Sequence, residues 1–158
     1  VFDDPAIRTA LQDRFGRAGA DSQRIDFSGF TADVPAYLAA YHDVDIALDP
    51  MPFSGGTTSY EAIWMGVPVL TAAGATPMAR QTASFMYALG HPEFVVPDVE
   101  HYARRAVELA AELATLARVR ASLRETARAS LFDAARYTRN LETAVRGLWR
   151  AACRRKFA

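Results

Sequence analysis

Residues 54–58 form the segment of this sequence whose residue types are best suited to binding a ligand. They read Ser-Gly-Gly-Thr-Thr and stand between an apolar stretch, residues 45–49, and a helix-forming stretch, residues 59–64. The two glycines allow the backbone to approach an anion closely. The first N–H groups of a helix have no partner within the helix, and the helix dipole places partial positive charge beside them. Thr57 and Thr58 would add hydroxyl donors, so the segment predicts a phosphate-binding loop.

The same segment also fits an ordinary strand-to-helix turn. In that alternative a threonine caps the helix, and Gly55 and Gly56 serve only to turn the chain. Glu61 stands three residues into the predicted helix, about one turn beyond the loop. A ribose attached to a bound diphosphate would hang near this position, and a carboxylate accepts hydrogen bonds from two hydroxyls well.

The elements around this loop alternate between strands and helices. Apolar stretches of about five residues are separated by helices of about ten residues or more, which is typical of right-handed βαβ crossovers. The sequence therefore predicts an α/β fold with a doubly wound, Rossmann-like parallel sheet. Strands are expected over residues 24–29, 44–48, 67–71 and 94–96, and helices over residues 5–15, 33–41, 59–64, 77–89, 98–129 and 133–153.

The last third of the chain is helical and amphipathic. Residues 133–153 place apolar side chains at helical spacing, and such spacing usually reflects core packing. We expect residues 99–153 to form a helical part that covers the sheet of a single domain over residues 1–158. The side chains concerned are Tyr137, Leu141, Val145, Leu148 and Trp149.

Ligands of an open parallel sheet bind beyond the carboxyl ends of its strands. The loop after the strand expected at 24–29 leads to Tyr37, and the loop after the strand at 44–48 is the glycine-threonine segment. If the two strands are neighbours, a flat aromatic ring and a phosphate-binding loop face the same crevice. Arg80, after the next strand, could reach this crevice and balance the charge of a diphosphate.

Composition narrows the function classes. Eighteen basic residues balance eighteen acidic ones over 158 residues, so no overall field draws the chain to nucleic acid or an anionic membrane. The three histidines and one cysteine show no metal-ligand spacing. The sequence contains no long apolar run, signal-peptide pattern, Walker lysine or nucleophile-elbow motif. We expect a cytoplasmic domain without a cofactor or metal, and without a nucleic-acid or membrane partner.

The segments Asp45–Asp49, Phe53–Thr58 and Glu61–Val69 together resemble the nucleotide-sugar half of the O-linked N-acetylglucosamine transferase family, glycosyltransferase family 41. Plant SPINDLY proteins belong to this family, and its bacterial and plant members usually carry tetratricopeptide repeats before the catalytic domain. The resemblance continues through residues 74–80 and 131–137 and covers essentially the whole chain.

This resemblance implies a GT-B fold, in which two Rossmann-like halves hold a UDP-GlcNAc donor without an essential metal. The sugar passes to Ser or Thr hydroxyls of a protein with inversion. Thr57 and Thr58 match the threonines that bind the diphosphate, and Glu61 matches the acidic residue that holds the ribose. Tyr37 stands where the family has a histidine against the uracil, and Thr31 lies near the loop that reads the uracil edge. Arg80 also matches a family position.

The chain departs from the family pattern in several places. Gly56 replaces a histidine of the animal enzymes, and residues 33–35 lack the expected basic residue. The family's phosphate-contacting lysine and its catalytic histidine are expected before Val1, so no catalytic residue is expected within these residues. We also expect an apolar strand before the first helix, and an open sheet edge that favours self-association of the isolated chain.

The sequence therefore predicts the UDP-binding half of an inverting protein O-glycosyltransferase, with UDP or UDP-GlcNAc and a protein acceptor as partners. On its own the chain would bind UDP weakly and catalyse nothing. A non-catalytic nucleotide-binding or scaffold module is the alternative from another class. Another GT-B transferase, such as an N-glucosyltransferase or O-fucosyltransferase, is the third possibility.

Overall fold

The computed structural model describes residues 3–156. Contacts between α-carbons divide the chain into two compact units, residues 1–40 and residues 41–158, and each is described by itself. The expectation of one domain over the whole chain stays a prediction.

Within residues 3–40, the first unit contains two α-helices, each capped by an aspartate. Helix α1 (Pro5–Arg17) begins where the side chain of Asp4 accepts a hydrogen bond from the N–H of Ala6. Helix α2 (Val34–Ala39) begins in the same way at Asp33. Both helices were expected, because an aspartate before a proline in the first turn is a strong helix start.

The strand predicted over residues 24–29 is wrong. Residues Ser22–Arg24 form a 3₁₀ helix, and residues 25–29 are not assigned to a strand. Asp3 lies against this segment: its carboxylate accepts a hydrogen bond from the N–H of Phe30, and a side chain at Gly29 would collide with it. Ile25 and Phe27 are partly buried without belonging to a strand, so their alternation did not require a sheet.

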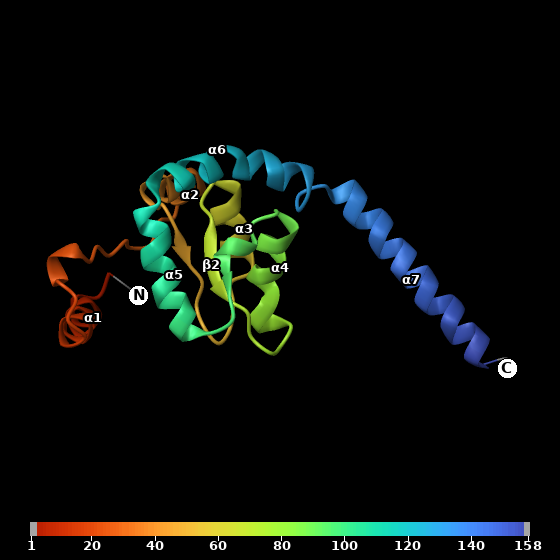
Figure 1. Cartoon of the computed structure of the whole chain (residues 1–158), viewed down its shortest axis with the longest axis horizontal. Coiled ribbons are helices and arrows are strands. Elements are labelled where there is room, and N and C mark those ends of the chain that lie inside the picture. Colours follow the sequence, from red (N-terminus) through yellow and green to blue (C-terminus); the bar gives the residue numbers. More distant parts are fainter. Residues whose placement is uncertain (1–2, 157–158) are drawn as a thin grey trace. The chain divides into compact units, whose positions relative to one another are not determined.

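The second unit is a parallel sheet with helices on both faces (Figure 1). Its sheet order is β1-β2-β3, with Ala47 beside Val69 and Thr71 beside Val95. This confirms the predicted α/β fold with parallel strands. The elements are β1 (Ala47–Leu48), α3 (Thr57–Trp64), β2 (Val69–Ala72), α4 (Gln81–Ala88), β3 (Val95–Val96), α5 (Val99–Ala111), α6 (Leu113–Ala129) and α7 (Ala134–Lys156), with 3₁₀ helices at Ala40–Asp43, Met78–Arg80 and Pro92–Phe94.

The core lies between the sheet and its helices. Figure 1 shows α5 on one side of β2, and α3 and α4 on the other. All three helices contact β2, and α6 packs on α3 and α5. The fully buried apolar residues include Ile63, Leu70, Met86, Phe94, Leu109 and Leu123.

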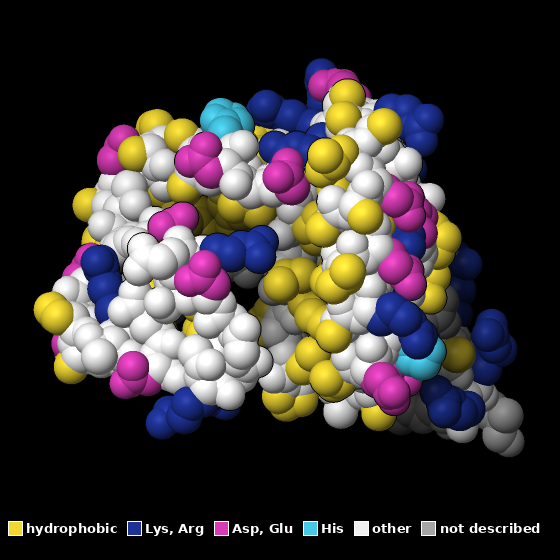
Figure 2. All heavy atoms as spheres, turned by 60° about the vertical axis from the view of Figure 1, so that its left-hand side comes forward, with side chains coloured by type: hydrophobic (Ala, Val, Ile, Leu, Met, Phe, Trp, Pro, Cys, Tyr) yellow, Lys and Arg dark blue, Asp and Glu magenta, His cyan; other side chains and the backbone are white. Residues whose placement is uncertain are grey.

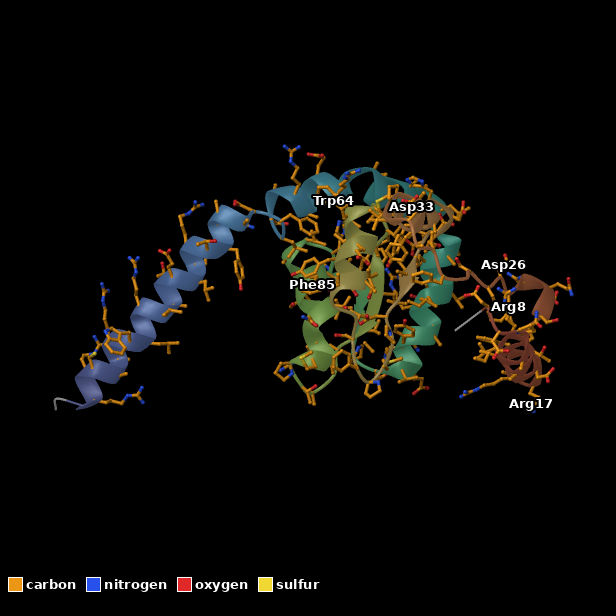
Figure 3. All side chains as sticks on the ribbon, turned by 180° about the vertical axis from the view of Figure 1, so that it is seen from behind. Arg8, Arg17, Asp26, Asp33, Trp64 and Phe85 are labelled. Carbon is orange, nitrogen blue, oxygen red and sulfur yellow. The ribbon has the colours of Figure 1, made fainter. Side chains whose placement is uncertain are left out.

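Aromatic side chains extend this core past the sheet. The ring centroids of Tyr60 on α3 and Phe85 on α4 are 4.1 Å apart. The ring of Phe132, between α6 and α7, is nearly perpendicular to that of Trp64, with the centroids 5.2 Å apart, and the guanidinium of Arg124 lies 4.4 Å from the centroid of Trp64. Figure 3 labels Trp64 and Phe85 on their two helices. These contacts hold α3, the helix that follows the glycine-threonine segment, through the face that carries Tyr60 and Trp64.

The C-terminal helices differ from the prediction in two ways. The helix expected over residues 98–129 is broken at Glu112, which has φ −96° and ψ 51°. The apolar side chains of α7 do not cover the sheet: Tyr137, Val145 and Trp149 are at least half exposed. Periodicity identified the helix correctly, but a regular apolar spacing does not say what the helix packs against.

The surface agrees with the balanced composition. On the face drawn in Figure 2, acidic and basic side chains are interspersed. Within residues 3–156, no helix combines the length and apolar character needed to cross a membrane.

Candidate functional site

The candidate site is built on residues 50–56, which connect Asp49 at the end of β1 to α3 and which we call the cradle loop. The hydroxyl of Ser54 is buried and donates to the carbonyl of Met78 at 2.5 Å. The N–H of Gly55 donates to Oδ1 of Asp49 at 2.7 Å. The cradle loop is therefore tied at two successive residues to groups outside it.

Helix α3 begins without a side-chain cap. Its N-cap is Gly56, so the alternative of a threonine cap is wrong, and Thr57 and Thr58 are the first two helical residues. By contrast, aspartates cap α1, α2 and α5. A helix start whose first N–H groups bind no side-chain cap leaves these groups, and the positive end of the helix dipole, for an external anion. Thr57 and Thr58 are both exposed at this end.

Gly55 has a steric reason to be a glycine. A Cβ atom built on it would lie 2.3 Å from Oγ of Ser59 and 3.1 Å from Oδ1 of Asp49. Only a residue without a side chain allows the cradle loop to pass this close to the first turn of α3.

Glu61 and Arg80 are the remaining predicted site residues of this unit. Glu61 is partly buried on α3, one turn beyond Thr57. Arg80 is exposed at the end of the 3₁₀ helix Met78–Arg80, whose first residue accepts the hydrogen bond from Ser54. The structure thus ties the turn that carries Arg80 to the cradle loop.

Thr31 and Tyr37 belong to the first unit. Thr31 lies in the loop before α2, Tyr37 lies on α2, and both are partly buried. Their expected place beside the phosphate-binding segment stays a prediction.

Tyr41 is an aromatic residue of the second unit that the sequence analysis did not select. Its hydroxyl lies 3.5 Å from the carbonyl of Thr58. Together with Thr58, Ser59 and Asp49 it lines a pocket of about 190 Å³. Its spacing of four residues from Tyr37 could have pointed to it, because both positions would share one face of a helix.

Buried polar residues form a second feature that the sequence analysis missed. Asp49, Ser59, Thr71 and Thr82 are all buried and are joined by hydrogen bonds of 2.6–3.1 Å. The sequence showed Asp49 only as a residue at a strand end. Thr71 and Thr82 carry no pattern that sets them apart from other threonines.

Tyr102 closes this cluster from α5. Its hydroxyl donates to the backbone carbonyl of Asp49 at 2.9 Å. Burial and the nearby Asp49 charge raise the pKa of Tyr102 to about 12. The phenol is therefore a stable donor at neutral pH.

A larger apolar pocket opens at the carboxyl ends of the strands. It measures about 440 Å³ and is lined by residues 50–52, 72–76 and 97–99, with Ala79. This is the edge of an open α/β sheet at which ligands bind. Among residues 3–156, no group of three or more histidine, cysteine, aspartate or glutamate side chains is arranged to hold a metal ion.

Comparisons with known proteins show which family this chain belongs to. The family model described as Glycosyl transferase family 41 matches residues 6–141. A protein of Solanum lycopersicum, named a probable UDP-N-acetylglucosamine–peptide N-acetylglucosaminyltransferase SPINDLY, is 33% identical over 149 residues, which are 94% of this chain and 16% of that protein. The Caenorhabditis elegans UDP-N-acetylglucosamine–peptide N-acetylglucosaminyltransferase is 31% identical over 133 residues, or 84% of this chain and 12% of the relative.

A solved structure shows the same fold. The Thermobaculum terrenum O-GlcNAc transferase mutant K341M superposes with a TM-score of 0.87 at 39% sequence identity. The match covers 97% of this chain and 29% of that one. The chain thus spans less than a third of the solved relative and about a sixth of the plant one.

Proposed function

Because this chain belongs to glycosyl transferase family 41, we propose that it is the donor-binding half of a protein O-glycosyltransferase that uses UDP-GlcNAc. The observation that carries the proposal is the start of α3: an uncapped helix N-terminus, preceded by two glycines and followed by two exposed threonines, at the carboxyl end of a parallel strand. A diphosphate is the part of the donor that this arrangement suits.

In the proposed complex, the N–H groups of the first turn of α3 and the hydroxyls of Thr57 and Thr58 donate to the diphosphate. Glu61 accepts from the ribose hydroxyls, Tyr37 faces the base with Thr31 at its edge, and Arg80 adds positive charge. These assignments follow the family pattern and are supported by the exposure of both threonines and of Arg80.

The proposed reaction is displacement at the anomeric carbon. A Ser or Thr hydroxyl of an acceptor protein attacks this carbon, the bond to the diphosphate oxygen breaks, and UDP leaves with inversion. Donors aimed at the leaving diphosphate stabilise the charge that develops on it in the transition state. The catalytic base, the family's tetratricopeptide repeats and the other GT-B half are proposed to belong to a longer polypeptide, located in the cytoplasm.

Calorimetric titration with three nucleotides tests the donor assignment. We expect the chain to bind UDP, and to bind GDP and AMP at least about tenfold more weakly, as a site that reads the uracil edge requires. Preference for GDP would contradict the UDP-GlcNAc assignment and would favour a fucosyl donor. Equal binding of all three nucleotides would contradict recognition of the base.

A further inference from the structure

Asp49 lies at the carboxyl end of β1 with 4% of its surface exposed. Its Oδ2 accepts a hydrogen bond from the hydroxyl of Thr71 on β2 at 2.6 Å. On the other side, its Oδ1 accepts from the N–H of Gly55 at 2.7 Å and lies 3.1 Å from the hydroxyl of Thr82. One carboxylate oxygen therefore contacts the sheet and the other contacts the cradle loop.

The contacts on the loop side surround Gly55. The hydroxyl of Thr82 lies 3.1 Å from the carbonyl of Gly55 and 3.0 Å from Oγ of Ser59 on α3. Both backbone polar groups of Gly55 thus have partners outside the cradle loop, and Thr82 links these partners to the first turn of α3. A glycine held at its N–H and its C=O has little freedom left, although its residue type is the most flexible.

The charge of Asp49 does not explain its position. A carboxylate beside an anion-binding loop repels the anion, since like charges at short range raise the free energy. Its useful contribution to such a loop is geometric, because a carboxylate can accept several hydrogen bonds at once.

We propose that Asp49 is a positioning residue for the nucleotide diphosphate. By holding Gly55 it sets the direction of the first N–H groups of α3 and of Thr57 and Thr58 before the ligand arrives. Donors that are already oriented cost little reorganisation when charge reaches them. The identity of the ligand in this inference rests on the proposed function. The contact between Asp49 and Gly55 does not depend on it.

The test uses the 158-residue chain and two readouts. The first is hydrogen exchange of the Gly55 amide by NMR, which needs no ligand, and the second is the Kd for UDP. In Asp49→Ala we expect exchange at Gly55 to accelerate at least about tenfold, because its acceptor is lost, and UDP affinity to fall about tenfold. Asp49→Asn keeps an acceptor oxygen for Gly55, and we expect it to recover most of both losses.

Thr71→Val is the matched control. Thr71 is fully buried and bonds the same carboxylate, but on the side of the sheet. We expect the melting temperature of the Thr71→Val variant to fall. Its affinity for UDP and the exchange rate of its Gly55 amide should change less than about threefold. Thr82→Val, also fully buried, removes the hydroxyl on the loop side and should weaken UDP binding more than Thr71→Val.

These arms separate the possible failures. Unchanged exchange at Gly55 in Asp49→Ala, or equal loss of UDP affinity in Thr71→Val, would overturn the inference. If Asp49→Ala does not fold, equal UDP affinities of Thr82→Val and Thr71→Val would overturn it instead. If the unaltered chain does not bind UDP, the proposed function fails, and the exchange experiment still decides whether Asp49 holds Gly55.

Discussion

Gly55 is a position at which one methyl group should disturb the candidate site. In Gly55→Ala the new Cβ would lie 2.3 Å from the buried Oγ of Ser59, which is itself bonded to Thr82. We expect the free energy of unfolding in urea to fall by about 1–3 kcal/mol. Gly147→Ala on α7 is the matched control: open space surrounds that glycine, and the free energy of unfolding should rise by about 0.5–1 kcal/mol. Equal effects at the two positions would contradict the packing described for the cradle loop.

The half-buried phenol of Tyr102 makes the free energy of unfolding depend on pH. Its pKa is raised to about 12 in the folded chain from 10.0 when unperturbed. Between these two pH values the unfolded phenol loses its proton while the folded one keeps it. The contribution of the protonated Tyr102 phenol to the free energy of unfolding is therefore fully present below pH 10 and is lost as the pH rises toward 12. Urea unfolding at pH 9 and pH 11 should show a larger loss in the unaltered chain than in Tyr102→Phe. An identical pH dependence in the two proteins would contradict the burial of this phenol.

Residue types alone located the cradle loop but not the groups that hold it. Gly55, Gly56, Thr57 and Thr58 could be selected because glycine and threonine next to a helix start have a local meaning. The interaction of Asp49 with Gly55 spans six residues, and that with Thr82 spans 33. Such pairs become neighbours only through the fold, so no local pattern reveals them.

Two leucines of α6 test the packing at the scale of elements. Leu123 is fully buried, whereas Leu113 is 68% exposed on the same helix. We expect Leu123→Ala to lower the free energy of unfolding by about 2–5 kcal/mol, and Leu113→Ala to lower it by less than about 0.5 kcal/mol. Chemical denaturation of both variants provides the measurement. A similar loss in the two would mean that α6 packs through a different face.

Most helices could be predicted from periodicity and caps, and the errors have physical causes. Residues 98–129 contain neither glycine nor proline, so nothing local announced the break at Glu112. Leu109 before the break and Leu116 after it are both buried, and α5 and α6 contact different elements. The break therefore lets α5 pack on the sheet while α6 packs on α3. Residues 25–29 stay irregular although Ile25 and Phe27 alternate as in a strand, because an alternating pattern does not supply a neighbouring strand to pair with.

At the scale of the whole molecule, the isolated chain is expected to self-associate. The exposed apolar residues of α7 add a second reason to the predicted open sheet edge, since exposed apolar surface favours association. Light scattering should show a mass that increases with concentration. Leu148→Glu on α7 should reduce this increase, whereas Thr143→Glu, at a polar and exposed position of α7, should leave it unchanged. A monodisperse monomer at all concentrations would contradict the prediction.

Titration calorimetry of UDP against the Thr57→Val/Thr58→Val double variant tests the phosphate-binding assignment most directly. Valine keeps the shape of threonine and removes only the two hydroxyl donors. Thr138→Val/Thr143→Val is the control, because it makes the same change at two exposed threonines of α7. We expect the unaltered chain and the control to bind UDP alike, and the double variant to bind at least about tenfold more weakly. UDP affinity that is the same in all three proteins, or no binding to the unaltered chain, would contradict a diphosphate site at the start of α3.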